Sequence, residues 1–216
     1  MRKASSILSP IHVGRLNASF QKWKNTGANS AILNVISSRY KLHLLLLPKA
    51  SVFNNNRSAV HHAEFVDSEI QKLLQLKCIS KVEIVPKVIN PLIVAESRSG
   101  KLRMVLDCRH VNLCLHKFKH RYENVITARH LFGKGDFTFI FDLKSAYHHN
   151  EIFDEQKQYL GFAWRTNYYV FSVLPFGLST SGFIFDKVMR HLVKFWHAQG
   201  IRLIMYLVDG LQQPAV

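Results

Sequence analysis

Acidic side chains are scarce in this chain. Of its 216 residues, 14 are Asp or Glu against 29 Lys or Arg, which gives a formal net charge of +15 and a pI near 9.9. Such a balance favours polyanionic partners. The basic residues are spread along the chain rather than gathered on one face of an amphipathic helix, so the charge indicates nucleic acid rather than a membrane surface as the partner.

Cysteine is also scarce, and its spacing excludes two common uses. Cys78, Cys108 and Cys114 form no Cys-x-x-Cys pair, so the sequence predicts neither a disulfide framework nor a zinc knuckle. His116 lies near the last two cysteines, but this spacing matches no usual zinc pattern, and scattered surface histidine is the better interpretation. We therefore expect a protein of a reducing compartment, that is, an intracellular protein of the cytoplasm or nucleus.

Long apolar runs are missing as well. The run Leu42–Leu47 is too short to span a bilayer, and the Met-Arg-Lys start is not followed by a continuous apolar stretch with a cleavage site. We expect no targeting segment and no membrane association. With 48% hydrophobic residues, however, the chain can bury a core of one or two globular domains.

Strong periodicity begins after residue 60. Residues 1–60 form a poorly defined N-terminal region, for which a helix around Leu16–Trp23, a polar loop and no chemistry are predicted. An amphipathic helix is then expected over Glu64–Lys77, because apolar residues recur there at helical spacing. Strands are predicted to follow at Ile79–Val85, Pro91–Ala95 and Leu102–Leu106, the last two joined by a turn at Ser97–Lys101.

Two groups of cations in this region suit phosphate binding. Lys101 lies near the tip of the predicted hairpin and Arg103 on its return strand, where both could contact a phosphate group; ordinary solvated charge is the alternative. Between Asn112 and Arg129, basic residues and histidines interleave with Phe118 and Tyr122. That mixture is suited to gripping a strand backbone and stacking on bases.

An acid ends an apolar strand at Asp142. Phe139, Ile140 and Phe141 are β-prone in succession, which predicts a strand buried on both faces. Because a buried unpaired carboxylate costs several kcal/mol, Asp142 should lie at an open strand end with a cation, a metal or backbone donors as its partner. Two interpretations remain: a metal ligand, or the N-cap of a helical turn over 144–147.

A second acid follows the last predicted strand. Strands at Tyr159–Trp164 and Tyr168–Leu174 lead into Pro175-Phe176-Gly177, and a long helix is expected to stop near Gly200. The next strand, Ile201–Leu207, is expected to end at Asp209. Adjacent strands that end in carboxylates at one sheet edge can hold two divalent cations, and Mg²⁺ prefers such oxygen ligands. Two independent caps or turn residues are the alternative.

Three motifs in this order resemble those of the reverse transcriptases of retroelements. They are Phe141-Asp142-Leu143-Lys144-Ser145-Ala146-Tyr147-His148-His149, Leu174-Pro175-Phe176-Gly177-Leu178-Ser179 and Tyr206-Leu207-Val208-Asp209-Gly210. The resemblance runs from about His61 to Gly210. Their wording is most similar to DIRS-type elements, with gypsy-like elements next. The resemblance implies the RNA-directed DNA polymerase domain of a retrotransposon polyprotein. Its α+β fold would be a right-hand polymerase, with an antiparallel sheet and packed helices, a fingers-like region at 61–135 and a partial palm at 136–216.

The resemblance also implies roles for individual residues. Asp142 and Asp209 would be catalytic and would bind two Mg²⁺ ions together with the backbone carbonyl of Leu143. The incoming deoxynucleoside triphosphate would contact Lys101, Arg103, Tyr147, Phe176 and Gly177. Among these, the tyrosine would screen the sugar 2′ position, and the glycine would allow close backbone approach. The implied partners are an RNA or DNA primer–template and the nucleotide, and the oligomeric state is left open.

The sequence departs from the family pattern at three places. Active members carry adjacent aspartates in the last motif, whereas Val208 precedes Asp209 here, and valine offers neither charge nor a ligand oxygen. Gly182 stands where related sequences have proline near the helix start, at modest expected cost. The chain stops six residues after Gly210, so we expect the return strand of the last hairpin, the rest of the palm and the thumb to be absent.

These departures predict a truncated domain with little or no polymerase activity. Metal neutralisation is worth several kcal/mol in phosphoryl transfer, so losing about 5 kcal/mol would slow the reaction on the order of 10³- to 10⁴-fold. Two alternatives stay open at this point. The chain is either a nucleic-acid-binding module without catalysis, which needs only the basic surface, or a non-functional translated relic of an element.

Overall fold

The computed structural model describes residues 13, 15–123, 125–133, 135–143, 145–206 and 209–212, except the side chains of residues 125, 209, 211 and 212. The helices are α1 (Arg15–Ala18), α2 (Phe20–Asn25), α3 (Ser30–Ser38), α4 (Arg57–His61), α5 (Ala63–Gln75), α6 (Arg109–Asn112), α7 (Val125–Leu131) and α8 (Ser181–Ala198), with 3-10 helices η1 (Ala146–His149) and η2 (Asp154–Tyr159). The strands are β1 (Ser51–Val52), β2 (Ile79–Val82), β3 (Val88–Ile89), β4 (Leu92–Glu96), β5 (Leu102–Leu106), β6 (Phe139–Asp142), β7 (Gly161–Trp164), β8 (Asn167–Phe171), β9 (Leu203–Tyr206) and β10 (Asp209–Gln212).

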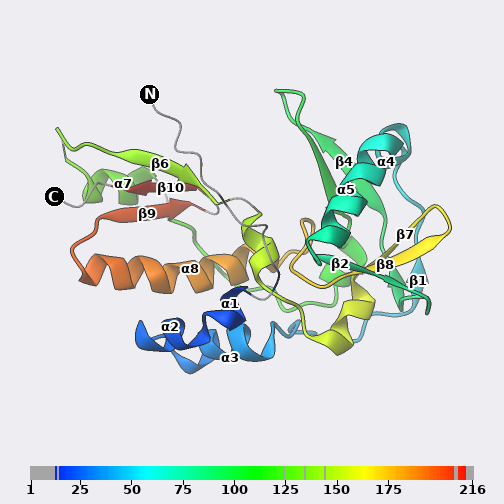
Figure 1. Ribbon diagram of the computed structural model, residues 1–216, viewed down its shortest axis with the longest axis horizontal. Coiled ribbons are helices and arrows are strands. Elements are labelled where there is room, and N and C mark those ends of the chain that lie inside the picture. The colour runs from blue at the N-terminus through cyan, green and yellow to red at the C-terminus, as the bar shows by residue number, and fades with distance from the viewer. Residues whose placement is uncertain are drawn as a thin grey trace.

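These elements build an α+β fold, as the sequence predicts. The strands form a sheet of order β1-β3-β7-β8-β2, a sheet of order β6-β10-β9 and the hairpin β4-β5. Figure 1 shows the first sheet and the hairpin on one side of the molecule, with α4 and α5, and the β6-β10-β9 sheet on the other side, above α8. No helix in the described part of the chain is both long and apolar enough to cross a bilayer.

The amphipathic helix and the hairpin lie where their patterns predict them. Helix α5 buries Val66, Ile70 and Leu73, which recur at helical spacing. The helix packs against β2 and β5. The β4–β5 hairpin closes through a turn in which the Ser97 N–H donates to the Lys101 carbonyl at 3.0 Å. The predicted hairpin is therefore confirmed, and it projects at the top of Figure 1.

The larger sheet joins strands from distant parts of the sequence. Strands β7 and β8 form an antiparallel hairpin that pairs with β2 on one side and β3 on the other. The β1–β3 and β3–β7 pairings are parallel, so this sheet is mixed rather than purely antiparallel. Two strands that follow Asp142 in the sequence therefore share a sheet with three strands that precede it.

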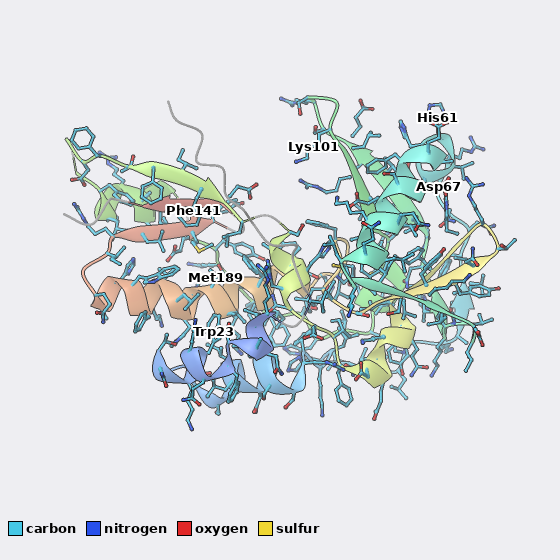
Figure 2. The ribbon with its side chains drawn as sticks, viewed as in Figure 1. Trp23, His61, Asp67, Lys101, Phe141 and Met189 are labelled. Atoms are coloured by element: carbon cyan, nitrogen blue, oxygen red, sulfur yellow. The ribbon has the colours of Figure 1, made fainter. Side chains whose placement is uncertain are left out.

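The smaller sheet packs one face on the long helix α8. Val193 of the helix is buried with Leu203 and Met205 of β9, and Phe141 and Met189 pack against this cluster. Figure 2 shows Phe141 and Met189 in the space between the sheet and α8. This packing places the C-terminal end of β6 beside the middle of the helix.

The prediction that β6 is buried on both faces is wrong. In the described chain β6 pairs only with β10 and is the edge strand of its sheet. Phe139 is 44% exposed and Ile140 is 78% exposed, while Phe141 faces the helix. Three successive apolar residues cannot all face one layer, because side chains alternate along a strand.

The N-terminal helices complete the core beneath α8. Trp23 of α2 and Ile32 and Ile36 of α3 are buried in one cluster with Val188 of α8. The Asn29 side chain caps α3 by accepting from the backbone N–H of Ile32 at 3.0 Å. The region that carried the weakest sequence patterns is therefore a structural support of the long helix.

Candidate active site

The two predicted carboxylate positions lie opposite one another in the smaller sheet. Strand β6 ends at Asp142 and β10 begins at Asp209, and the antiparallel register pairs these two residues. Asp209 is also the register partner of Tyr206 in β9. The structure describes the backbone of Asp209 but not its side chain, and Val208 lies outside the described residues.

The β9–β10 pairing corrects two expectations. Asp209 does not end the strand Ile201–Leu207 but starts the next one, β10, which pairs antiparallel with β9. The return strand that was expected to be absent is present as β10, and it lies between β6 and β9. The few residues after the motif suffice because a short strand in the middle of a sheet gains hydrogen bonds on both edges.

The N-cap interpretation of Asp142 is wrong. The helical turn that follows is the 3-10 helix η1, which begins at Ala146, and the residue before it is Ser145 with φ 54° and ψ 37°. Asp142 is exposed at the open end of β6. The carboxylate of Asp142 therefore does not cap this helical turn, and metal ligation is the interpretation that remains of the two that the sequence offered.

Asp142 lines a cavity of about 610 Å³. Leu143 and Ser145 line it beside Asp142, Phe185 and Met189 contribute from α8, and Trp23 and Lys72 contribute from α2 and α5. Leu143 is half-buried and packs on the Val193–Leu203–Met205 cluster. The strand end is thus anchored by an apolar side chain while the carboxylate next to it stays open to solvent.

Three of the predicted nucleotide-binding residues form one contact series. The Arg103 guanidinium lies over the Phe176 ring at 5.1 Å from its centroid, and the Tyr147 and Phe176 ring centroids are 5.1 Å apart. Tyr147 also meets Phe185 of α8 edge to face at 5.6 Å. Burial raises the pKa of the Tyr147 hydroxyl, Tyr122 adds to the rise, and the Arg103 cation opposes it.

Gly177 shows why the turn after β8 needs glycine. Its φ is +103°, and a Cβ built there would lie 1.8 Å from the carbonyl oxygen of Leu106 in β5. The backbone of this turn also accepts a hydrogen bond, since the Leu106 N–H donates to the Phe176 carbonyl at 3.1 Å. The turn therefore docks directly on the strand that carries Arg103.

Asn112 is a residue of this site that the sequence patterns did not single out. Its Nδ2 donates to the Gly177 carbonyl at 2.9 Å, and its Oδ1 accepts from the Ser179 N–H at 2.9 Å. One amide thus holds both sides of the turn at the start of α8. An isolated Asn in a basic stretch has no spacing that would have predicted this role.

Lys101 lies apart from the Arg103 series. It is exposed, and Figure 2 shows it near the tip of the β4–β5 hairpin. Its backbone N–H donates to Ser97 Oγ at 3.0 Å, which orders the turn. Within the described residues, no group of three or more His, Cys, Asp or Glu side chains is arranged to hold a metal ion.

Comparisons with known proteins give a consistent answer. No protein-family model matches the chain. It is 31% identical over 117 residues, 54% of its length, to a putative enzymatic polyprotein of Cassava vein mosaic virus. It is 26% identical over 183 residues, 81% of its length, to the retrovirus-related Pol polyprotein from transposon 412 of Drosophila melanogaster. The chain spans 18% and 14% of these two polyproteins.

Among solved structures, the crystal structure of the prototype foamy virus protease–reverse transcriptase matches with a TM-score of 0.64. The match covers 94% of this chain and 26% of that one, at 17% sequence identity. The chain has the fold of a reverse-transcriptase-like domain. Its sequence relatives include the polyprotein of a retrotransposon, as the three motifs predict, and polyproteins of two viruses. The likeness confirms the predicted α+β polymerase fold, and the placement among DIRS-type elements stays a prediction.

Proposed function

We propose that this reverse-transcriptase-like domain binds a deoxynucleoside triphosphate and a primer–template in the manner of an RNA-directed DNA polymerase, and that its metal site is incomplete. The observation that carries the proposal is the register of the smaller sheet, which sets Asp142 and Asp209 side by side at the strand ends. Carboxylates at adjacent strand ends supply the oxygen ligands that Mg²⁺ prefers.

The residues around Asp142 fit one hard cation better than two. Asp142 is exposed at an open strand end, Asp209 is its register partner, and the backbone carbonyl of Leu143 is the third oxygen of the proposed set. Val208 adds no oxygen where a further carboxylate is expected. Mg²⁺ bound there would neutralise phosphate charge during nucleotidyl transfer, and the shortage of ligands is the basis for proposing weak or absent polymerase activity.

The remaining roles follow from the contact series on the other side of the turn. Arg103 would attract the triphosphate of the nucleotide, and Lys101 near the hairpin tip would add a second cation. Tyr147 would press on the sugar, where its ring leaves no space for a 2′ hydroxyl. Phe176 and Gly177 would form the floor beneath the nucleotide.

Metal binding tests the proposed site without requiring a complete polymerase. Mn²⁺ binding to the chain, followed by water-proton relaxation, should be weak, should be lost in Asp142→Asn and should tighten on the order of tenfold or more in Val208→Asp. Glu155→Gln removes an exposed carboxylate on η2 and serves as the control, with no expected change. Unchanged Mn²⁺ affinity in both site variants would remove Asp142 and the position of Val208 from the metal site.

Nucleotide binding tests the contact series separately. Titration with a fluorescent dATP analogue should show weaker binding in Arg103→Ala and Lys101→Ala, whereas Lys81→Ala on β2 removes an exposed lysine outside the series and should bind normally. Extension of a primed RNA template by the unaltered chain with Mg²⁺ would overturn the proposed inactivity. Affinities that fall equally in all three lysine and arginine variants would assign the effect to overall charge.

Binding of nucleic acid without catalysis is a second candidate, and the net charge of +15 supports it. Each phosphate neutralised by Lys or Arg releases counterions, so the affinity for primer–template should fall steeply as salt rises. Fluorescence anisotropy between low and physiological ionic strength measures that slope. A flat response would remove this candidate.

A further inference from the structure

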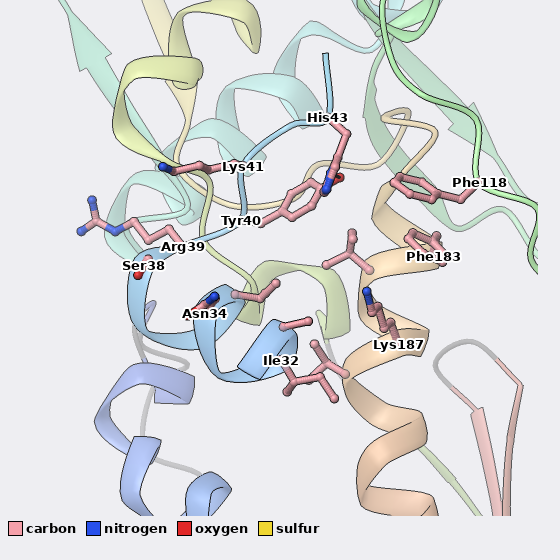
Figure 3. A pocket seen from close by; sticks show the side chains of 14 residues that line it. Ile32, Asn34, Ser38, Arg39, Tyr40, Lys41, His43, Phe118, Phe183 and Lys187 are labelled. Atoms are coloured by element: carbon pink, nitrogen blue, oxygen red, sulfur yellow. Dashed lines mark hydrogen bonds between the residues drawn. The ribbon is translucent and has the colours of Figure 1, made fainter. Parts of the chain in front are cut away.

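A second cavity lies between α3 and α8, away from the proposed nucleotide site. Its volume is about 430 Å³, the size of a small-ligand pocket. The floor is apolar and comes from Ile32 and Val35 of α3 and from Ile184 and Val188 of α8. Figure 3 shows this space bounded by the two helices and by the segment that carries Tyr40 and His43.

One wall of this cavity is aromatic. Phe118 and Phe183 stack with ring centroids 4.3 Å apart and planes 12° from parallel, and both line the cavity. His43 meets the Phe118 ring edge to face at 5.2 Å, and its Nδ1 lies 3.2 Å from the Tyr40 hydroxyl. Aromatic side chains are the surfaces on which nucleic-acid bases stack, and each of these two rings has a face that the other does not cover.

The cations at the rim differ in how far they are already engaged. Arg39 is paired with Glu151 and Asp154, and Lys41 lies over the Phe153 ring at 4.4 Å. Lys187 extends from α8 toward the cavity (Figure 3), where its amine lies over the Phe183 ring at 5.9 Å from the ring centroid. No carboxylate of the described residues is within ion-pair distance of this amine. Burial lowers the pKa of His43, and the positive charges of Lys187 and His116 lower it further. The open end of the cavity is therefore positive and suited to an anion.

The cavity and the proposed nucleotide site lie on different sides of α8. Phe183 and Lys187 line the cavity, whereas Phe185 contacts Tyr147. Since each residue of an α-helix advances by about 100°, Phe185 is roughly 200° around the axis from Phe183. A ligand in the cavity would thus not compete for the Arg103–Phe176–Tyr147 series.

We propose that this cavity binds a nucleoside phosphate, with the base on the Phe118–Phe183 wall and the phosphate at Lys187. The shared chemistry has two sources, a free mononucleotide or an unpaired residue of a single strand. The site goes beyond the proposed polymerase function, because it requires neither Asp142 nor a metal. It also assigns a function to part of the basic and aromatic stretch that follows Asn112, because Phe118 of that stretch lines the cavity.

The test compares a labelled oligo(dT) with an abasic oligonucleotide of the same length and charge, by fluorescence anisotropy. Oligo(dT) should bind more tightly, and Phe118→Leu should remove that difference, on the order of tenfold, while leaving the abasic affinity unchanged. Leucine keeps an apolar side chain against Phe183, and thermal melting of the variant confirms folding. Equal effects of Phe118→Leu on both oligonucleotides, or no effect on either, would overturn the base site.

The phosphate contact has a matched control on the same helix. Lys194 is exposed two turns after Lys187 and does not line the cavity, so Lys187→Gln and Lys194→Gln remove the same charge from the same side of α8. Lys187→Gln should weaken oligo(dT) binding several-fold more than Lys194→Gln. Equal losses would mean that only overall charge acts, and the phosphate assignment would fall.

Competition identifies the source of the ligand. Displacement of oligo(dT) from the Phe118-dependent site by free dTTP would assign a mononucleotide, and resistance to dTTP would assign a residue of a strand. Photocrosslinking of a 5-iodouracil oligonucleotide should map to Tyr40, His43 or Phe118, and crosslinks confined to the β4–β5 hairpin and Phe176 would overturn the proposal. Arg103→Ala changes the proposed polymerase site and not this cavity, so its effect on nucleotide binding tests the proposed function independently of the Phe118-dependent site.

Discussion

The substitution Gly177→Ala places a methyl group where the chain has no room for one. The backbone of Gly177 has φ +103°, and the added Cβ would lie 1.8 Å from the Leu106 carbonyl oxygen and 2.9 Å from its carbon. Both atoms belong to the backbone of β5, so no side-chain rotation can relieve the contact. Either the Pro-Phe-Gly turn or the strand has to move.

The cost follows from the contacts that hold the turn in place. An L-residue in a left-handed conformation costs about 1–2 kcal/mol. Moving the turn away from β5 weakens the hydrogen bond from the Leu106 N–H to the Phe176 carbonyl and the one from Asn112 Nδ2 to the Gly177 carbonyl, each worth about 1 kcal/mol. Together the expected loss is about 3–4 kcal/mol, a large part of the roughly 5–15 kcal/mol net stability of a domain.

Urea unfolding followed by circular dichroism measures this loss, with Gly135→Ala as the matched control. Gly135 has a similar φ of +94°, but nothing lies within 4 Å of its added Cβ, so the control isolates the backbone strain. We expect it to cost about 1–2 kcal/mol. Equal losses in the two variants would refute the close approach of the turn to β5, and so would a Gly177→Ala loss below about 1 kcal/mol.

Three further changes test other parts of the fold. Trp23→Ala should cost about 3–5 kcal/mol in urea unfolding, because Trp23 is buried against Val188 beneath α8; a loss below about 1 kcal/mol would mean that α2 is not part of the core. Arg109→Ala should destabilise the chain at neutral pH, since the Asp107 side chain is 7% exposed and its hydrogen bonds with Arg109 hold its pKa low. That difference should vanish as pH falls through the lowered pKa of Asp107, and a difference independent of pH would contradict the pairing. Burial lowers the pKa of His148 from 6.5 to about 4, so the unfolded chain takes up this proton first and the free energy of unfolding should fall between those two pH values. His148→Gln should flatten that part of the pH profile, and an unchanged profile would refute it.

Local patterns determined much of this protein from sequence alone. The helical spacing of Val66, Ile70 and Leu73 predicted α5, and the turn residues around Gly100 predicted the β4–β5 hairpin. The apolar stripe of α8 and its stop near Gly200 were also read correctly. These features depend on residues a few positions apart, so they can be predicted from local sequence without knowledge of the rest of the fold.

The order of the three motifs also determined the fold class, because each motif joins a strand to a particular turn or helix. The roles of Lys101, Arg103 and the two aspartates remain predictions of that resemblance. Sequence reasoning failed where an element's environment mattered. Phe139 and Ile140 belong to an edge strand, although their apolar character alone indicated a buried one.

Only the tertiary structure decided which distant residues meet. The register that sets Asp142 opposite Asp209, the seating of Phe176 under Arg103 and the two-sided hold of Asn112 on the Pro-Phe-Gly turn all join segments far apart in the chain. The cavity between α3 and α8 likewise needs both helices and the Phe118 segment at once. The physical reason is that a residue's type limits what it can contact, whereas packing of the whole chain selects the contact that it makes.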